Sequence, residues 1–279
     1  MVRPGLVRGA VLTCAWLMLF LVSVYLFYPS RRINSAIDQT LSSQGLSLTP
    51  AAHKTVLPGL GWDNALLSSR QGPLLRFDRV SARPLLLRLL TGRAVLGSAA
   101  SLGAGRMNLV YTMSGEQQVQ VSVDSLALAD MPFFKTVLGA RVGGSLWSEG
   151  LVTRGPQGWN GELKVEISRL EFSGIRMGAF PLPDAANLSS KGMVRITNGK
   201  ARLESLTLQG EGVYMRLSGE LPLGINADTA ALELLLEIMP KPEFIEKQRL
   251  VFLLLTKFMA SPGVYRVPIK GTLLKPEIL

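Results

Sequence analysis

Residues 118–128 read Gln-Val-Gln-Val-Ser-Val-Asp-Ser-Leu-Ala-Leu, and their first half alternates strictly between polar and apolar side chains. Successive side chains of a β-strand point to opposite faces, so the alternation predicts a strand with one apolar and one solvated face. Residues 162–167, Glu-Leu-Lys-Val-Glu-Ile, repeat the pattern. Such strands are typical of antiparallel sheets with one face in water. The sequence therefore predicts a mainly β protein.

A layout of eight residues recurs in segments that begin at Leu75, Val121, Val165 and Ala201. In each segment, two alternating apolar positions precede a polar pair such as Asp124-Ser125, and two more apolar positions follow in shifted phase. A β-bulge absorbs such a shift and bends the strand. We therefore expect an elongated, curved antiparallel sheet built from loosely repeated strands.

Turn and helix signals separate these strands. Asn198-Gly199 lies between two alternating runs and predicts a two-residue hairpin turn. A few short helices are expected, within residues 33–45, 84–90 and 133–138. A longer amphipathic or apolar helix is predicted over residues 243–260, with Phe252 and Leu255 on one stripe. This C-terminal helix is expected either to cover the apolar side of the sheet or to rest on a membrane.

An uncharged apolar run occupies residues 9–28. As a helix, it would be about 30 Å long, which is the thickness of a bilayer core. It therefore predicts a transmembrane anchor. A cleaved signal peptide is the alternative, but the run is long for one and lacks a small-residue cleavage site. The expected anchor residues are Trp16, Leu19, Phe20, Tyr25, Phe27, Tyr28, Arg31 and Arg32.

Composition excludes several functions. The 279 residues carry a formal net charge of +10, with one cysteine and one histidine. These numbers exclude a disulfide framework and a Cys/His zinc cluster. The basic residues are spread singly, so nucleic acid is not an expected partner. His53 is expected in an exposed loop, and Glu162, Glu166 and Glu171 on solvated strand positions. We expect no catalytic, cofactor-binding or metal-binding residues, and no enzyme.

Three segments carry a resemblance to a known family. They are residues 77–92 (FDRVSARPLLLRLLTG), residues 103–111 (GAGRMNLVY) and residues 267–276 (VPIKGTLLKP). Together with the predicted anchor, they resemble type II secretion system protein N, with AsmA-like envelope proteins as wider relatives. The resemblance implies a bacterial inner-membrane anchor at residues 1–32, a leading segment at 33–64 and a periplasmic, β-rich AsmA-like domain at 65–279. Flanking charges barely favour a cytoplasmic N-terminus.

Two functions stay open at this point. The resemblance implies a structural or assembly component of a type II protein secretion system, with secretion-system proteins and the lipid bilayer as partners. The alternative is an AsmA-like module that binds or bridges phospholipid through an apolar groove. The residues that either line this groove or form an ordinary core are Val119, Val121, Val123, Leu163, Val165, Ile167, Leu206, Leu208, Phe252 and Leu255.

Overall fold

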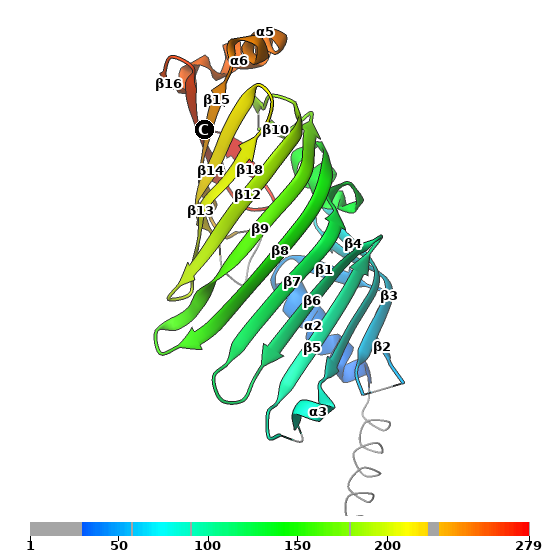
Figure 1. Ribbon diagram of the computed structural model, residues 1–279. Coiled ribbons are helices and arrows are strands. Elements are labelled where there is room, and N and C mark those ends of the chain that lie inside the picture. Colours follow the sequence, from blue (N-terminus) through cyan, green and yellow to red (C-terminus); the bar gives the residue numbers. More distant parts are fainter. Residues whose placement is uncertain (1–29, 57, 90, 179, 223–228, 279) are drawn as a thin grey trace, which may run out of the picture.

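The computed structural model describes residues 30–56, 58–89, 91–178, 180–222 and 229–278. Figure 1 shows one long curved sheet with a few helices around it. Within the described residues the sheet has 16 strands, and β10 and β11 form a separate pair. All these pairings are antiparallel. The prediction of a mainly β protein with a large antiparallel sheet is confirmed.

The strands follow one another along the sheet almost in chain order. That order is β1-β3-β4-β5-β6-β7-β8-β9-β12-β13-β14-β15-β17-β16, while β2 pairs with β3 and β18 with β17. The strands are β1 (Leu46–Thr49), β2 (His53–Lys54), β3 (Leu60–Ser69), β4 (Gly72–Pro84), β5 (Val95–Leu102), β6 (Gly105–Thr112), β7 (Gln118–Ala127), β8 (Arg141–Gly155), β9 (Gly158–Ser173), β10 (Arg176–Met177), β11 (Phe180–Pro181), β12 (Ala185–Thr197), β13 (Lys200–Gln209), β14 (Val213–Leu221), β15 (Glu233–Pro240), β16 (Met259–Ser261), β17 (Val264–Gly271) and β18 (Pro276–Ile278).

The predicted breaks in strand phase are real irregularities of the ladder. The register between β7 and β8 shifts between Val123 and Leu126, and Ser125 has a φ of 52°. In the segment that begins at Val165, Arg169 of the polar pair Ser168-Arg169 has a φ of 51°. The register of β13 shifts between Leu203 and Leu206. Each extra residue keeps the apolar positions on both sides of it on one face.

Strand β4 handles its polar pair differently. The register against β3 does not shift at Asp78-Arg79, and the positive φ of 52° falls on Asn64 of the facing strand. Asparagine tolerates this left-handed conformation better than most residues do. The Asp78 carboxylate instead accepts a hydrogen bond from the Gly103 N–H, at 2.7 Å.

The hairpin predicted at Asn198-Gly199 joins β12 to β13, and Thr197 pairs with Lys200. Both turn residues have positive φ, at 52° and 77°. This is the geometry of the two-residue turn that matches strand twist. The hairpin prediction is confirmed.

The described helices are α2 (Ser30–Ser43), α3 (Leu86–Leu89), α4 (Pro132–Leu138), α5 (Pro242–Lys247) and α6 (Arg249–Leu255), with 3-10 turns η1 (Leu128–Asp130) and η2 (Thr256–Phe258). The first three lie where they were predicted, although α3 is shorter because Pro84 still belongs to β4. Gly139 ends α4 in the left-handed conformation.

The prediction of one continuous helix over residues 243–260 is wrong. Gln248, with φ of −127° and ψ of 38°, separates α5 from α6, and Met259 lies in β16. At this break the Gln248 side chain bonds to a distant segment, as described below. The expectation that this region covers the sheet holds for one side of α6, where Phe252 and Leu255 are buried.

The N-terminal predictions meet the structure only from Ser30 onward. The predicted span at residues 9–28 lies outside the described residues, and Arg31 and Arg32 belong to α2. Within the described part of the chain, every helix is too short or too polar to cross a bilayer. The leading segment at 33–64 contributes α2, β1, β2 and half of β3, so its expected end falls inside a strand. Ile37 of α2 packs on the buried cluster of Ala52, Trp62 and Ala65.

Candidate functional site: the apolar face of the sheet

Continuous rows of apolar side chains line one face of the sheet, which we call the apolar face. Residues opposite each other in register point to the same face, so the pairings trace the rows. The upper row is Leu126, Leu146, Ile167, Ser190, Leu208, Met215, Ile238 and Tyr265. The middle row is Met107, Val123, Ser148, Val165, Gly192, Leu206, Leu217, Leu236 and Val267. The lower row is Leu109, Val121, Gly150, Leu163, Val194 and Leu203.

A second layer, which we call the cover, closes the upper row toward the C-terminal edge of the sheet. The cover consists of β10, β11, α5 and α6. Phe252 and Leu255 of α6 are buried against the sheet, and the Phe252 ring centroid lies 5.2 Å from that of Tyr265. Ile175 and Leu182, beside β10 and β11, belong to the same buried cluster. This end of the apolar face is therefore an ordinary packed core.

One side chain ties the two halves of the cover together. The Gln248 amide nitrogen donates to the Asp184 carbonyl at 2.8 Å, and its amide oxygen accepts from the Asp184 N–H at 2.7 Å. The Asp184 carboxylate in turn accepts from the Gly174 N–H at 2.8 Å. The Lys257 ammonium lies 4.2 Å from the Phe180 ring centroid, which adds a cation–π contact. The two bonds to Asp184 hold Gln248 at the break between α5 and α6.

Parts of the middle and lower rows, toward the other end of the strands, are less buried than the upper row. Leu109 is 39% exposed, and Leu163 and Val165 are half-buried and belong to none of the three buried clusters of the described residues. We call this region the open part of the apolar face, and it consists of Leu109, Val119, Leu163, Val165, Val194 and Leu206. The chemistry of the rows does not change between the covered and the open part.

All eight sheet residues that the sequence singled out lie on the apolar face. Four of them belong to the open part, and Val121 and Ile167 are half-buried near its border. Val123 and Leu208 are buried. The alternation that identified them predicts on which face of the sheet they lie. It does not predict whether another layer packs on that face.

In the open part of the apolar face, two glycines leave room for leucine side chains of the neighbouring strands to lie close to the sheet. A Cβ atom on Gly150 would lie 2.6 Å from a methyl carbon of Leu163, and one on Gly192 would lie 2.7 Å from a methyl carbon of Leu206. Both leucine side chains therefore lie over a glycine of the neighbouring strand. A larger residue at either position would push the leucine away from the sheet.

The opposite face is solvated and bears charge pairs between strands. Arg195 contacts Glu162 at 3.2 Å, and Lys191 contacts Glu166 at 3.4 Å. Glu162, Glu166 and Glu171 are exposed, as predicted. Exposed pairs of this kind contribute little to stability, about 0–1 kcal/mol each. Their arrangement shows which face of the sheet is in water.

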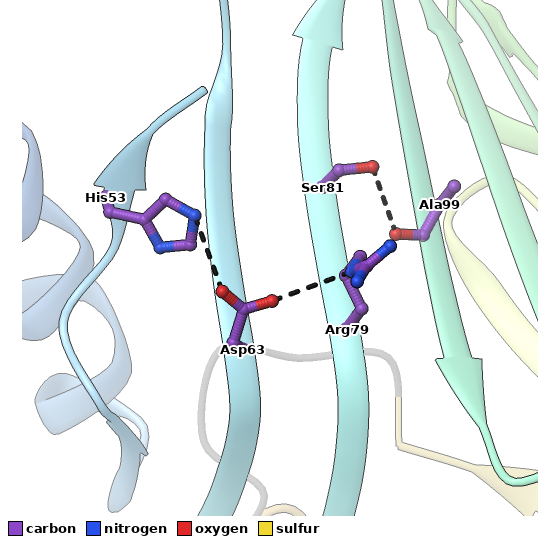
Figure 2. A network of polar contacts seen from close by, with 5 residues as sticks. All are labelled: His53, Asp63, Arg79, Ser81 and Ala99. Carbon is purple, nitrogen blue, oxygen red and sulfur yellow. Dashed lines mark hydrogen bonds and ion pairs between the residues drawn. The ribbon is translucent and has the colours of Figure 1, made fainter. Parts of the chain in front are cut away.

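His53 lies in a polar network at the N-terminal edge of the sheet (Figure 2). Its Nε2 atom is 3.7 Å from the Asp63 carboxylate, which is also 3.6 Å from the Arg79 guanidinium. The prediction of a loop is wrong, because His53 belongs to β2 and pairs with Gly61. The side chain is exposed, as expected. All three groups are more than half exposed, so the network is a surface feature.

No three His, Cys, Asp or Glu residues of the described chain come close enough to hold a metal ion. On the surface, the hydrogen bond and the charge of Glu277 raise the pKa of Lys275.

The sequence analysis did not identify one buried polar group in the upper row. Ser190 is 1% exposed, and its hydroxyl has no hydrogen-bond partner among the described residues. It lies between Ile167 and Leu208 in register. By contrast, the buried Ser148 hydroxyl donates to the Lys164 carbonyl at 2.8 Å.

Comparison with known proteins gives no match to this chain, whether with family models, with curated proteins or with solved structures. The resemblance to type II secretion system protein N therefore stays a prediction from the three segments that carry it.

Proposed function

We propose that this protein holds acyl chains of phospholipid on the open part of its apolar face. One observation carries the proposal, namely that the upper row of the apolar face is packed under the cover at Ile238 and Tyr265, whereas Leu163 and Val165 in the neighbouring rows are half-exposed. Contiguous apolar surface left in contact with water commonly marks an interaction site. Each methylene of an acyl chain that leaves water contributes roughly 0.8 kcal/mol. An elongated apolar strip suits a chain of methylenes better than a compact ligand.

The proposed setting is the bacterial inner membrane. In this setting, residues 9–28 cross the bilayer once, the N-terminus is cytoplasmic and the sheet is periplasmic. The setting rests on the apolar run and on the resemblance to secretion and AsmA-like envelope proteins. It supplies phospholipid next to the sheet. The proposed role is binding, without a reaction or a cofactor.

Photo-crosslinking locates the lipid. The full chain, purified from membranes grown with a diazirine fatty acid, is irradiated and its crosslinked peptides are mapped by mass spectrometry. We expect crosslinks on β7, β9 and β12 at apolar-face positions, and loss of these crosslinks in Val165→Asp. Lys164→Asp, on the opposite face of β9, is the control and should keep them. Crosslinks confined to residues 9–28 would overturn acyl-chain binding by the sheet.

A role in a type II secretion system is a second candidate, favoured by a different observation. Leu250 and Leu253 of α6 are 78% and 70% exposed, on the side of the helix away from the core. This apolar surface at the far end of the sheet fits a partner protein. Deletion of the gene should then stop exoprotein secretion, and Leu253→Asp should reproduce the defect at normal protein abundance. Unchanged secretion in the deletion strain would remove this candidate.

A further inference from the structure

The end of the sheet opposite α6 also has an exposed apolar tip, which we call the leucine tip. Leu86, Leu87 and Leu89 of α3 are 46%, 81% and 46% exposed. Met113, in the loop between β6 and β7, is 43% exposed. Its N–H donates to the Ala94 carbonyl at 2.8 Å, which holds this loop beside the segment that follows α3. Four large apolar side chains thus point into solvent at one place.

The fold holds the leucine tip in place. The Leu85 N–H donates to the Val95 carbonyl at 2.9 Å, so the chain closes α3 onto the start of β5. Leu85 itself points inward, where a Cβ on Gly97 would lie 3.3 Å from its side chain. The three exposed leucines follow this anchored one. Their exposure is therefore a property of a structured turn.

Three exposed arginines lie just before, within and just after α3 in the chain. Arg83, Arg88 and Arg93 are exposed, and none of them belongs to an ion pair of the described residues. Arg88 and Arg93 line an open hollow of about 390 Å³, whose lining also includes Ser114, Glu116, Gln118 and Gln120. Guanidinium groups beside hydroxyl and amide groups suit a phosphate, and the single carboxylate leaves an excess of positive charge. Apolar side chains next to arginine are typical of surfaces that rest on anionic bilayers.

The chain enters the described structure at this same end of the sheet. The Asn34 side chain of α2 donates to the Ala52 carbonyl, and the next residue, His53, pairs with Gly61. Gly61 pairs in turn with Ser81, two residues before Arg83. Figure 1 shows the start of α2 and α3 at one end and α6 at the other. The predicted span ends two residues before Ser30, so the bilayer it crosses would lie next to α3.

We propose that the leucine tip inserts into the interface of the bilayer that residues 9–28 cross, with Arg83, Arg88 and Arg93 on its anionic headgroups. The inference rests on the proposed inner-membrane setting, and it does not require lipid on the apolar face. Attachment through both the transmembrane span and the leucine tip fixes the orientation of the sheet relative to the bilayer, whereas the span alone does not. The strands then point away from the bilayer, with the open part of the apolar face nearest to it and α6 farthest.

A fluorescent label tests this contact in the full chain. Cys14→Ser removes the native thiol, and Leu87→Cys carries an environment-sensitive dye. The protein is reconstituted in vesicles of phosphatidylcholine and phosphatidylglycerol, with and without a lipid that bears a nitroxide quencher near its headgroup. Leu253→Cys, at a leucine that is 70% exposed at the opposite end, is the matched control.

We expect a blue shift and quenching at position 87 and neither at position 253. Arg88→Glu and Arg93→Glu should each weaken the contact roughly fivefold, read as the ratio of quenched to unquenched label. An unquenched label at 87, or equal quenching at both positions, would overturn the proposal. Failure of acyl-chain binding would appear separately, as missing crosslinks on β9 with quenching at position 87 intact.

Discussion

The two ends of the apolar face differ in what lies above them. Ile238 and Tyr265 in the upper row are buried under α6, whereas Leu163 and Val165, in neighbouring rows of the same sheet, are half-exposed. Both ends have the alternation, the antiparallel register and the apolar composition of a core. The comparison teaches that the sheet alone does not decide between core and binding surface. At the covered end, the packing of α6 on the upper row makes the difference.

The strongest test of this difference is to replace one leucine in each part of the apolar face with alanine. Leu255→Ala removes a side chain with 0% exposure and should lower the free energy of unfolding by about 2–5 kcal/mol, because a cavity remains. Leu163→Ala should cost roughly 1 kcal/mol or less, because its side chain is already in partial contact with solvent. Urea denaturation of the full chain in detergent measures both. Equal losses would mean that the open part is as tightly packed as the covered one.

The attachment of the cover is the next test. Gln248→Ala removes both hydrogen bonds to Asp184, which we expect to cost about 1–2 kcal/mol. Hydrogen exchange should accelerate at the Asp184 amide and along α5 and α6, with little change in β7 to β9. Gln120→Ala, an exposed glutamine on the solvated face, serves as the control. Uniform acceleration across the sheet would show that the cover does not open as a separate unit.

The smallest effect is expected where the upper row contains a polar atom. Ser190→Ala removes a buried hydroxyl without a partner and should leave stability unchanged or raise it by up to about 1 kcal/mol. Ser148→Ala removes a hydroxyl that donates to Lys164 and should lower stability by about 1 kcal/mol. Thermal melts of the two variants give opposite signs if this difference in partners holds. A clear loss in Ser190→Ala would point to a hydrogen bond that the described residues do not provide.

Local patterns in the sequence were sufficient to predict the sheet. Alternation around Val121 and Val165, the polar pair at Asp124-Ser125 and the turn at Asn198-Gly199 each depend on a few neighbouring residues. Strand faces, bulges and hairpins are set at that range. The apolar face was therefore predictable residue by residue.

The cover was not predictable in the same way. At the break, the Gln248 side chain bonds to Asp184, which lies 64 residues away in the chain. The helical periodicity of residues 243–260 carries no information on such a long-range bond, so it predicted one continuous helix through the break. The exposed side of α3 could not be predicted either, because Leu87 and Leu85 look alike in sequence, and only the structure shows that the Leu85 side chain lies over Gly97.

The order of the strands has a consequence for how the protein is made. Along most of the sheet each strand pairs with the one before it in the chain, so pairing needs only short loops to close. During synthesis from the N-terminus, strands can therefore join the sheet one at a time. Helices α5 and α6 are made late, so the upper row stays uncovered until near the end of synthesis, and we expect that interval to be the one most prone to aggregation.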